Sequence, residues 1–275
     1  FVIVSHNLNS SMAISTRKHT LASNCVSELS KFDQTPQGTE EWWNRRKNCL
    51  SGSKLANLSF LKSQADRVQY WEEVFGFRPR PPLDADALKR VKYGKDHEDD
   101  GVNEMLKNIK GIQMWEVGFE QHPNAFHRNW FGSSPDGVVY APDLMPDCPW
   151  GALEVKCSTK KNAGGKTVPH QGVPAYYMGQ MHAEMKCMPL PVQCKWTLFV
   201  SWSETKCKCY IVKFDDNFWN LLWDVSVDFT CSTSSWQAFK NKRDAMVSAS
   251  IELSSRAIAL HPRGGFVTSN KQNVK

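Results

Sequence analysis

The spacing of hydrophobic and polar residues predicts a helical first part of the chain. A helix from Thr39, a turn at 51–53 and a second helix start come first, and amphipathic helices follow over 64–76 and 84–109. The segment RPRPPLD separates the last two helices, because proline cannot continue a helix. Residues 1–38 are rich in Ser, Thr and Asn, and they predict an N-terminal arm with one short helix.

After residue 111 the hydrophobic period changes from 3.6 to 2, which indicates β-strands. The predicted elements are strands over 112–121, 126–130, 136–140 and 151–157, a flexible basic loop over 158–173, a helix over 174–188, strands over 193–203 and 207–214, and helices over 215–224 and 235–259. This order predicts one α/β domain over 39–260, with helices flanking a mixed central sheet. Residues 261–275 are predicted to be a C-terminal tail.

Composition agrees with a soluble globular domain. Hydrophobic residues make up 41% of the 275 residues and charged residues 23%, which excludes a disordered chain, a collagen or a coiled coil. No apolar run reaches the roughly 18 residues that span a bilayer, and the first residues lack the basic region of a signal peptide. The net charge of +6 suits a polyanionic partner without proving one.

The cysteine pattern favours free thiols rather than a disulfide framework. The number of cysteines, nine, is odd, and no two of them form a CxxC pair. We therefore expect an intracellular protein, nuclear if its source is eukaryotic and cytoplasmic if it is bacterial or phage. The histidines lack ligand spacing, so none is assigned to a metal.

Two acidic residues and a lysine form the sharpest pattern in the predicted sheet. Asp136 begins one strand in the sequence SPDG, and Glu154 and Lys156 stand two apart on the next, in LEVKC. Side chains two apart on a strand share a face, and Asp136 can reach that face from the adjacent strand. The two carboxylates and the backbone carbonyl of Val155 predict an oxygen cage for a hard divalent cation such as Mg²⁺. Lys156 would then orient the nucleophile or stabilise developing negative charge.

The alternative interpretation is an ordinary antiparallel strand pair with a surface Asp and a Glu–Lys ladder. Short charged patterns of this kind are common by chance. Leu153 and Val155 disfavour the alternative, because these apolar neighbours indicate a half-buried strand. Burying Glu154 and Lys156 is costly unless they serve each other or a metal.

Four motifs occur in order over about half of the chain. They are WWNRRKNCLSGS at 42–53, YGKDHE at 93–98, SPDG with LEVKC at 134–157, and YYMGQM at 176–181. Together they resemble the PD-(D/E)XK nucleases and, within them, the lambda-exonuclease and YqaJ-type viral recombinase group. The resemblance implies a single restriction-endonuclease-like domain, and it adds Glu98 and Gln180 to the catalytic set of Asp136, Glu154 and Lys156.

The same resemblance assigns further roles. Glu98 would be an additional metal ligand or a water-orienting acid, and its alternative is a solvated helix face. Gln180 would hold a phosphate or the attacking water, against a plain surface amide. Arg46 and Ser53 would bind a 5′-phosphate of DNA. Arg45 competes with Arg46, because neighbouring side chains point about 100° apart on a helix and only one should face the site.

The function implied is a Mg²⁺-dependent deoxyribonuclease, with Mn²⁺ as a substitute. The resemblance favours a 5′-to-3′ exonuclease on linear double-stranded DNA that serves recombination or end processing by two-metal phosphodiester hydrolysis. It also implies a single-strand annealing recombinase as partner and a trimer as oligomer. Two alternatives stay open: an endonuclease or RNase of the viral alkaline-nuclease type, and a non-catalytic DNA-binding module.

The predicted loop after the Glu154 strand carries positive charge. Lys160, Lys161 and Lys166 flank two glycines within it. In a nuclease this position would contact a DNA backbone. A solvated loop without a partner explains the same residues equally well.

Overall fold

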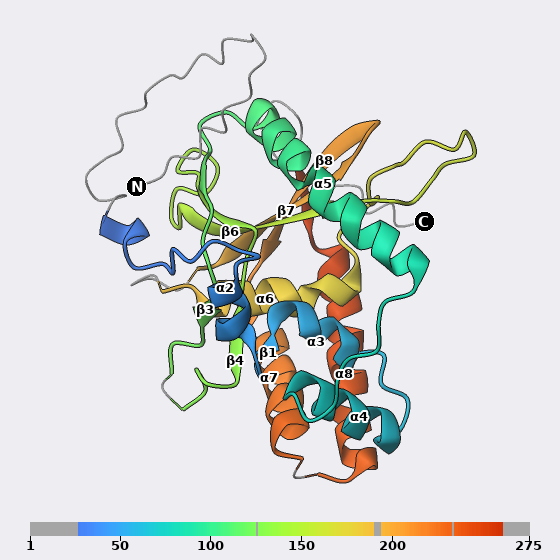
Figure 1. Ribbon diagram of the computed structural model, residues 1–275. Coiled ribbons are helices and arrows are strands. Elements are labelled where there is room, and N and C mark those ends of the chain that lie inside the picture. Colours follow the sequence, from blue (N-terminus) through green and yellow to red (C-terminus); the bar gives the residue numbers. More distant parts are fainter. Residues whose placement is uncertain (1–26, 125, 190–193, 233, 261–275) are drawn as a thin grey trace, which may run out of the picture. The chain divides into compact units, whose positions relative to one another are not determined.

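The computed structural model describes residues 27–124, 126–189, 194–232 and 234–260 (Figure 1). The chain divides into two units, Phe1–Lys31 and Phe32–Lys275, and all helices and strands named below belong to the second. Most of the predicted N-terminal arm and the whole predicted tail lie outside the described residues. Among the helices that are described, none combines the length and hydrophobicity of a membrane-spanning helix.

A six-stranded mixed sheet forms the centre of the fold, as the order of elements predicted. Its strands, in spatial order, are β2 (Gln113–Trp115), β5 (Gly137–Tyr140), β6 (Trp150–Cys157), β7 (Trp196–Ser203), β8 (Lys206–Lys213) and β9 (Ile258–Leu260). β6 and β7 run parallel, and the other neighbours run antiparallel. Both faces of β6 are covered, so its residues 151–155 are all buried. This burial explains the nearly continuous apolar run that predicted the strand.

A second, three-stranded sheet corrects two sequence predictions. It consists of β1 (Leu50–Ser51), β4 (Phe131–Ser133) and β3 (Glu120–Gln121), with β4 in the middle. The predicted strand over 112–121 is therefore two strands, β2 and β3, which belong to different sheets. The predicted strand over 126–130 is wrong, because the strand begins only at Phe131.

Turn chemistry at Asn124 explains the second error. Its side-chain carbonyl accepts a hydrogen bond from the backbone N–H of Phe126, and its backbone carbonyl accepts from those of His127 and Arg128. These bonds close turns over the residues that alternation assigned to a strand. The C-terminal predictions also need correction, because the last helix ends at Ser255 and strand β9 follows it.

The helices begin where polar residues cap them. They are α2 (Glu40–Arg46), α3 (Gly52–Leu58), α4 (Gln64–Val74), α5 (Ala85–Asn108), the short 3₁₀-helix η1 (Ala175–Tyr177), α6 (Met178–Cys187), α7 (Asp216–Cys231) and α8 (Trp236–Ser255). Thr39 caps α2 and Asp84 caps α5, each through a side-chain oxygen that accepts a backbone N–H of the first turn. α7 is longer than predicted and ends at Ser232, whose φ of 51° is left-handed.

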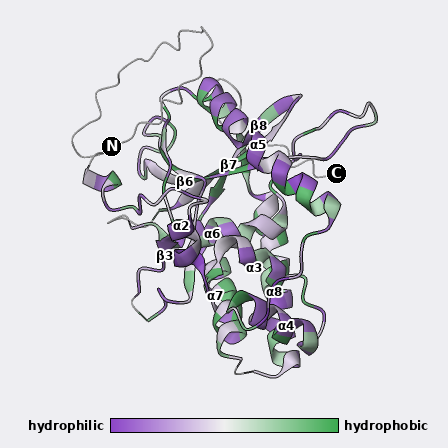
Figure 2. Ribbon diagram, viewed as in Figure 1, coloured by the Kyte–Doolittle hydropathy of each residue, from purple (hydrophilic) through white to green (hydrophobic). Residues whose placement is uncertain are grey.

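Helices cover both faces of the central sheet, as predicted for this fold class. α5 packs against β6, β7 and β8 on one face, where Met105 joins Leu153 and Leu198 in one hydrophobic cluster. Figure 2 shows a largely hydrophilic α5, whose buried residues are Gly101 and Met105. α6, α7 and α8 lie on the other face, where Phe199 belongs to a second, larger cluster. Successive side chains of β7 point to opposite faces of the sheet, so this strand contributes residues to both clusters.

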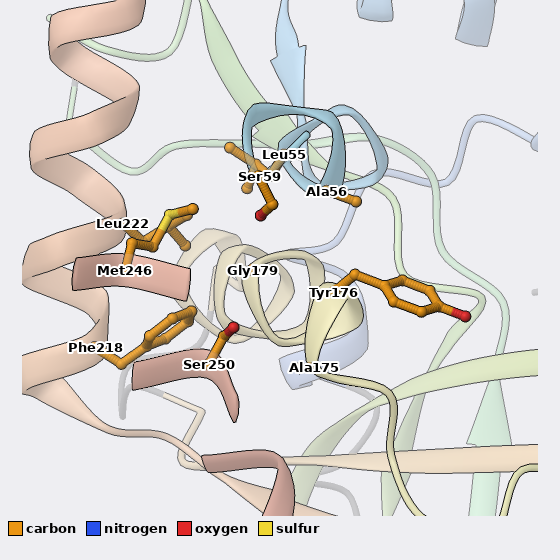
Figure 3. Close-up of a pocket in the computed structure, with 10 residues that line it drawn as sticks. All are labelled: Leu55, Ala56, Ser59, Ala175, Tyr176, Gly179, Phe218, Leu222, Met246 and Ser250. Atoms are coloured by element: carbon orange, nitrogen blue, oxygen red, sulfur yellow. The ribbon is translucent and has the colours of Figure 1, made fainter. Parts of the chain in front are cut away.

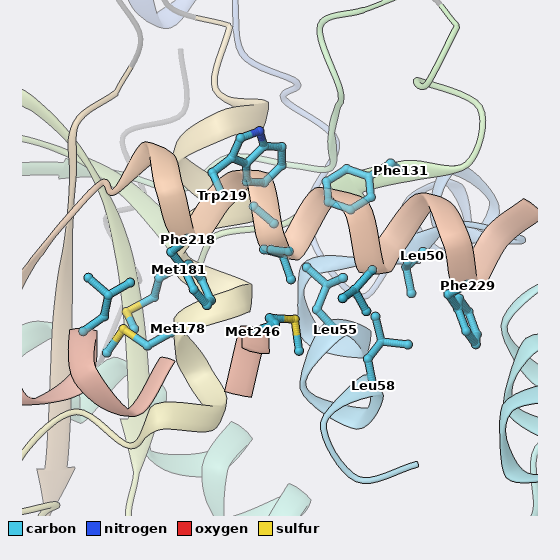
Figure 4. Close-up of a cluster of buried hydrophobic side chains, with 14 of the residues drawn as sticks. Leu50, Leu55, Leu58, Phe131, Met178, Met181, Phe218, Trp219, Phe229 and Met246 are labelled. Atoms are coloured by element: carbon cyan, nitrogen blue, oxygen red, sulfur yellow. The ribbon is translucent and has the colours of Figure 1, made fainter. Parts of the chain in front are cut away.

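The larger hydrophobic cluster connects the small sheet to the helical layer. Figure 4 shows α7 alongside residues of α3 and α6, with Phe218, Trp219 and Phe229 of α7 directed into the cluster. Leu50 and Phe131 of the small sheet belong to the same cluster and are fully buried. The segment around residue 51 is thus held at the edge of α6, which matters for the site described below.

An ion pair lies inside this helical layer. Arg67 of α4 and Asp228 of α7 are 1% and 2% exposed, and their charged atoms are 3.0 Å apart. Arg67 also donates to the backbone carbonyls of Asp228 and Ser234, and its guanidinium lies 4.3 Å from the centre of the Phe239 ring. Lys242 of α8 contacts the second carboxylate oxygen of Asp228 at 3.0 Å. The pair therefore joins α4, α7 and α8.

Asp228→Ala should destabilise the protein by about 3–5 kcal/mol at pH 7, because it leaves Arg67 buried without its partner. Urea unfolding measures the change. Asp96→Ala is the control, since it breaks the exposed Lys92–Asp96 pair of α5 and should cost at most about 1 kcal/mol. Equal losses in the two variants would contradict the role given to Asp228.

The loss should also depend on pH. Burial acts to raise the pKa of Asp228, but the hydrogen bond from Ser234 and the charges of Lys242 and Arg67 outweigh burial and lower it. A lowered pKa means that the charged form stabilises the fold above the unfolded pKa of about 3.9. The difference between wild type and Asp228→Ala should therefore shrink as the pH falls below about 4.

Candidate active site

Asp136 is fixed at the point where β5 begins. Its backbone N–H donates to the carbonyl of Leu153 at 3.0 Å, which extends the ladder between β5 and β6 by one residue. Its side-chain Oδ2 accepts the N–H of Val155 at 2.7 Å. The carboxylate thus accepts a hydrogen bond that a backbone carbonyl of a neighbouring strand would otherwise accept. In a strand the N–H and C=O of one residue leave the same edge, so the Val155 carbonyl also leaves β6 on the side of Asp136.

Glu154 lies at the centre of the predicted set. Its side chain is fully buried. Oε1 forms an ion pair with Lys156 and accepts a hydrogen bond from Nε2 of Gln180 at 2.7 Å. Oε2 is buried and has no hydrogen-bond partner among the described residues. The structure therefore brings three of the predicted residues into direct contact and leaves one carboxylate oxygen without a protein partner.

Gln180 links this carboxylate to an acid that sequence reasoning missed. Its Nε2 donates to Oε1 of Glu154 and, at 2.9 Å, to Oε1 of Glu184, one turn further along α6. Both N–H groups of the amide are then engaged, so its Oε1 is the atom left to accept a bond. Glu184 is 1% exposed. The sequence did contain a signal for Glu184. This residue follows Gln180 by four positions, and residues four apart lie on the same face of a helix.

Glu98 reaches the same region from α5. Burial, and secondarily the charge of Glu154, raises the pKa of Glu98. Gly101, one turn after Glu98, is the position where α5 presses on the sheet, since a Cβ there would lie 2.7 Å from a methyl group of Val155. The close approach that glycine permits brings Glu98 within electrostatic range of the carboxylates on β6.

The charges at the site repel and compensate one another. Burial and then the charge of Glu154 raise the pKa of Asp136 well above its ordinary value. Burial acts to lower the pKa of Lys156, but the carboxylates of Glu154 and Asp136 outweigh it and raise that pKa. The Lys156 ammonium also lies 5.2 Å from the centre of the Tyr177 ring. Crowded carboxylates of this kind are stabilised by a positive charge placed between them.

These observations fit a hard divalent cation. Oε2 of Glu154 has no partner among the described residues, and burial together with the neighbouring carboxylate charge raises the pKa of Asp136 and Glu98. Both observations point to a missing positive charge. Oxygen donors alone are present, which suits Mg²⁺ or Mn²⁺. No group of three or more His, Cys, Asp and Glu side chains in the described part of the chain is already spaced to hold a metal. Asp136, Glu154 and the Val155 carbonyl would hold the ion, with Glu98 beside them.

The predicted phosphate-binding residues lie together near these carboxylates. Arg46 donates to the hydroxyl of Ser53 at 3.1 Å and to that of Ser51 at 3.4 Å. Its guanidinium lies 4.0 Å from the centre of the Trp42 ring. Arg45 points elsewhere and forms ion pairs with Glu41 and Asp33. The two neighbouring arginines therefore have different surroundings, and Arg46 is the one directed at the serines.

Lys54 adds a second cation that the motifs did not indicate. Burial, and then the nearby charge of Arg80, lowers the pKa of Lys54 to about 8. The same two causes lower the pKa of Arg46 to about 10. Neither cation forms an ion pair with a carboxylate among the described residues. Lys54 donates to the backbone carbonyls of Cys49 and Val74, and Arg46 donates to the two serine hydroxyls. Two nearby cations without a carboxylate partner favour an anion here.

Gly52 places this anion site against α6. A Cβ on Gly52 would lie 2.4 Å from the hydroxyl of Ser133 and 3.4 Å from the backbone carbonyl of Gln180. The junction of β1 and α3, which carries Ser51 and Ser53, therefore packs directly on the helix that carries Gln180. The cavity in Figure 3 lies on a different face of α6, and no charged side chain lines it, so it suits neither a metal nor a phosphate.

A family model matches the part of the chain that carries these motifs. The crystal structure of an alkaline exonuclease (LHK-Exo) from Laribacter hongkongensis is similar at 22% identity and a TM-score of 0.49, over 79% of this chain and 99% of that one. No curated protein matches the sequence. The family described as the YqaJ-like viral recombinase domain matches residues 41–189, which is more than half of the chain. The mixed sheet flanked by helices is the PD-(D/E)XK fold expected of that family. The chain therefore belongs to the YqaJ-like viral recombinase domain family.

Proposed function

We propose that this protein is a Mg²⁺-dependent deoxyribonuclease, and that it degrades linear double-stranded DNA from a 5′ end to serve recombination or end processing. The observation that carries the proposal is Glu154, a fully buried carboxylate with one unpartnered oxygen, in contact with Lys156 and Gln180. Membership of the YqaJ-like family supports it.

The residues of the site divide the chemistry between them. When bound, Mg²⁺, or Mn²⁺ in its place, supplies Lewis-acid stabilisation of charge on the scissile phosphate, with two ions expected from the family resemblance. Lys156 is the positive group beside the carboxylates, and it would stabilise charge that develops on the phosphate. Gln180 presents its carbonyl oxygen, which would accept a hydrogen bond from the attacking water and so orient it.

The anion site supports an exonuclease. Arg46 and Ser53, with Lys54 beside them, would bind a terminal 5′-phosphate, and the loop around Gly52 holds them next to Gln180. A charged pocket beside the cleavage site would select the end of a strand. An endonuclease or an RNase of the viral alkaline-nuclease type remains the second candidate, and it would not require this pocket. The contacts between Glu154, Lys156 and Gln180 argue against a non-catalytic DNA-binding module.

Double-stranded DNA is the partner that the site chemistry suits. A single-strand annealing recombinase and a homotrimer are further proposals, and they rest on the family resemblance alone. An exonuclease that exposes a single strand would supply the substrate of such a recombinase.

Asp136→Asn and Glu154→Gln should each abolish cleavage of a linear duplex in Mg²⁺, because each removes a charged oxygen ligand while keeping the side-chain shape. Digestion in Mg²⁺ or in EDTA measures cleavage, and calorimetry with Mn²⁺ measures metal binding. The thermal midpoint of each variant is the control for folding. A variant that folds and cleaves at nearly the wild-type rate would disprove the ligand assignment.

Glu184→Ala should slow cleavage by about 10-fold or more, since it removes the acceptor that holds the amide of Gln180 in one orientation. Glu184→Gln is the matched variant, because its amide oxygen can accept the same hydrogen bond, and it should retain most of the rate. Single-turnover rates at saturating DNA separate this effect from binding. Equal rates in the two variants would show that Glu184 does not position Gln180.

Arg46→Ala should slow cleavage of a 5′-phosphorylated duplex by about 10–100-fold, since a hydrogen bond to a charged group contributes about 1.5–3 kcal/mol. On a 5′-hydroxyl duplex the loss should be much smaller, because that end lacks the charged group. Arg45→Ala is the control, since Arg45 already pairs with Glu41 and Asp33. An equal loss on both duplexes would make Arg46 a general DNA contact instead.

A further inference from the structure

The basic loop after β6 is an ordered hairpin rather than the flexible loop predicted from the sequence. The N–H of Val168 donates to the carbonyl of Lys160 at 2.8 Å, and that of Asn162 to the carbonyl of Lys166 at 2.9 Å. Lys161 and Thr167 form an antiparallel bridge. At the tip, the side chain of Asn162 accepts the N–H groups of Gly164 and Lys166. These bonds give residues 160–168, called the basic hairpin below, a defined shape.

The base of the basic hairpin is attached to the turn between β7 and β8. The hydroxyl of Thr205 donates to the carbonyl of Thr167 at 2.7 Å, and the N–H of Glu204 donates to the hydroxyl of Thr167 at 3.3 Å. Just before the hairpin, the N–H of Ser158 donates to the carbonyl of Trp202 at 2.8 Å. The hairpin is therefore anchored to β7 and to the β7–β8 turn, and in the chain it follows β6, the strand that carries Glu154.

The carboxylate of Glu204 lies at the base of the basic hairpin, and it accepts a hydrogen bond from the hydroxyl of Thr167 at 3.3 Å rather than pairing with a lysine. Lys160, Lys161 and Lys166 are exposed, and none of them forms an ion pair among the described residues. The sequence contains no Asp or Glu between residues 155 and 183. By contrast, Lys89 and Lys92 on α5 each pair with an aspartate. Ordered lysines that no acid neutralises form a site for a polyanion.

The basic hairpin continues the strand that carries Lys156. Lys160 lies four positions after Lys156, and an extended strand spans at most about 14 Å over that length. Successive base pairs of duplex DNA are about 3.4 Å apart along the axis. The hairpin is therefore within reach of phosphates about four base pairs or fewer from the scissile one. His170 is within electrostatic range of both lysines, since burial and then the charges of Lys160 and Lys156 lower its pKa.

We propose that the basic hairpin grips the sugar–phosphate backbone of the DNA duplex beside the cleavage site. This inference rests on the proposed nuclease function for its substrate, but it concerns binding rather than cleavage. The lysines offer charge without the planar, bidentate groups that read base edges. Binding through the hairpin should therefore be independent of DNA sequence and sensitive to salt.

The test replaces all three lysines with glutamine. Asn162 and Thr167, which hold the hairpin, are kept. The affinity for a 5′-phosphorylated 30-base-pair duplex is measured by fluorescence anisotropy in EDTA over a series of salt concentrations. Each lost phosphate contact should reduce the slope of log affinity against log salt by about 0.9, so we expect a reduction of about 2–3. We also expect affinity to fall at least 10-fold at low salt.

A matched variant removes the same charge elsewhere. Lys107, Lys110 and Lys213 are exposed at the far ends of α5 and β8. Replacing them with glutamine also lowers the net charge of +6 by three. This variant should keep the wild-type slope. The proposal is overturned if both variants lose slope equally, if neither does, or if the wild-type protein does not bind the duplex. Thermal unfolding checks that both variants fold.

The outcomes also separate this proposal from the nuclease function. If the wild-type protein binds DNA through the hairpin but cleaves nothing in Mg²⁺, the hairpin proposal stands and the proposed function fails. If it cleaves, and the hairpin variant loses no salt dependence, the function stands and the hairpin proposal fails. In an active enzyme the hairpin variant should raise KM with little change in kcat, because its lysines lie outside the catalytic set.

Discussion

The buried charge of Glu154 is the constraint on which the site depends. Moving a carboxylate out of water costs several kcal/mol unless other groups compensate for the lost hydration. Here Lys156 and Gln180 compensate one oxygen, and the other has no partner among the described residues. Burying Glu154 with one unpartnered oxygen therefore adds little to the stability of the fold. The arrangement is understandable where a cation binds the free oxygen.

Three packing contacts keep that carboxylate in place. Asp136 accepts the N–H of Val155 and so aligns β5 with β6. Gly101 allows α5 to approach β6 closely, which brings Glu98 toward the same point. On the opposite face, Gln180 comes from α6, whose apolar residues lie in the large cluster of Figure 4. The geometry of the candidate site is thus a consequence of how two helices pack on one strand pair.

Local patterns predicted the centre of the site, but they could not predict what long-range packing adds. Strand alternation placed Glu154 and Lys156 on one face, because that depends only on neighbouring residues. The pairing of Glu184 with Gln180 requires α6 to be buried against the sheet, and the environment of Lys54 depends on the approach of Arg80. The strand predicted over 126–130 failed for a different, local reason, since hydrogen bonds to Asn124 form turns there.

The distribution of positive charge is more informative than its total. Lysines on the helical surfaces are largely neutralised, as Lys89, Lys92 and Lys240 are by aspartates on the same helix. The cations near the site are not: Arg46 donates to serine hydroxyls, Lys54 donates to backbone carbonyls, and the basic hairpin has no acid within its sequence. A net charge of +6 alone does not identify a partner. Unpaired cations on two segments next to one group of carboxylates support the two proposals made above, that a DNA strand is held at its end by one segment and along its backbone by the other.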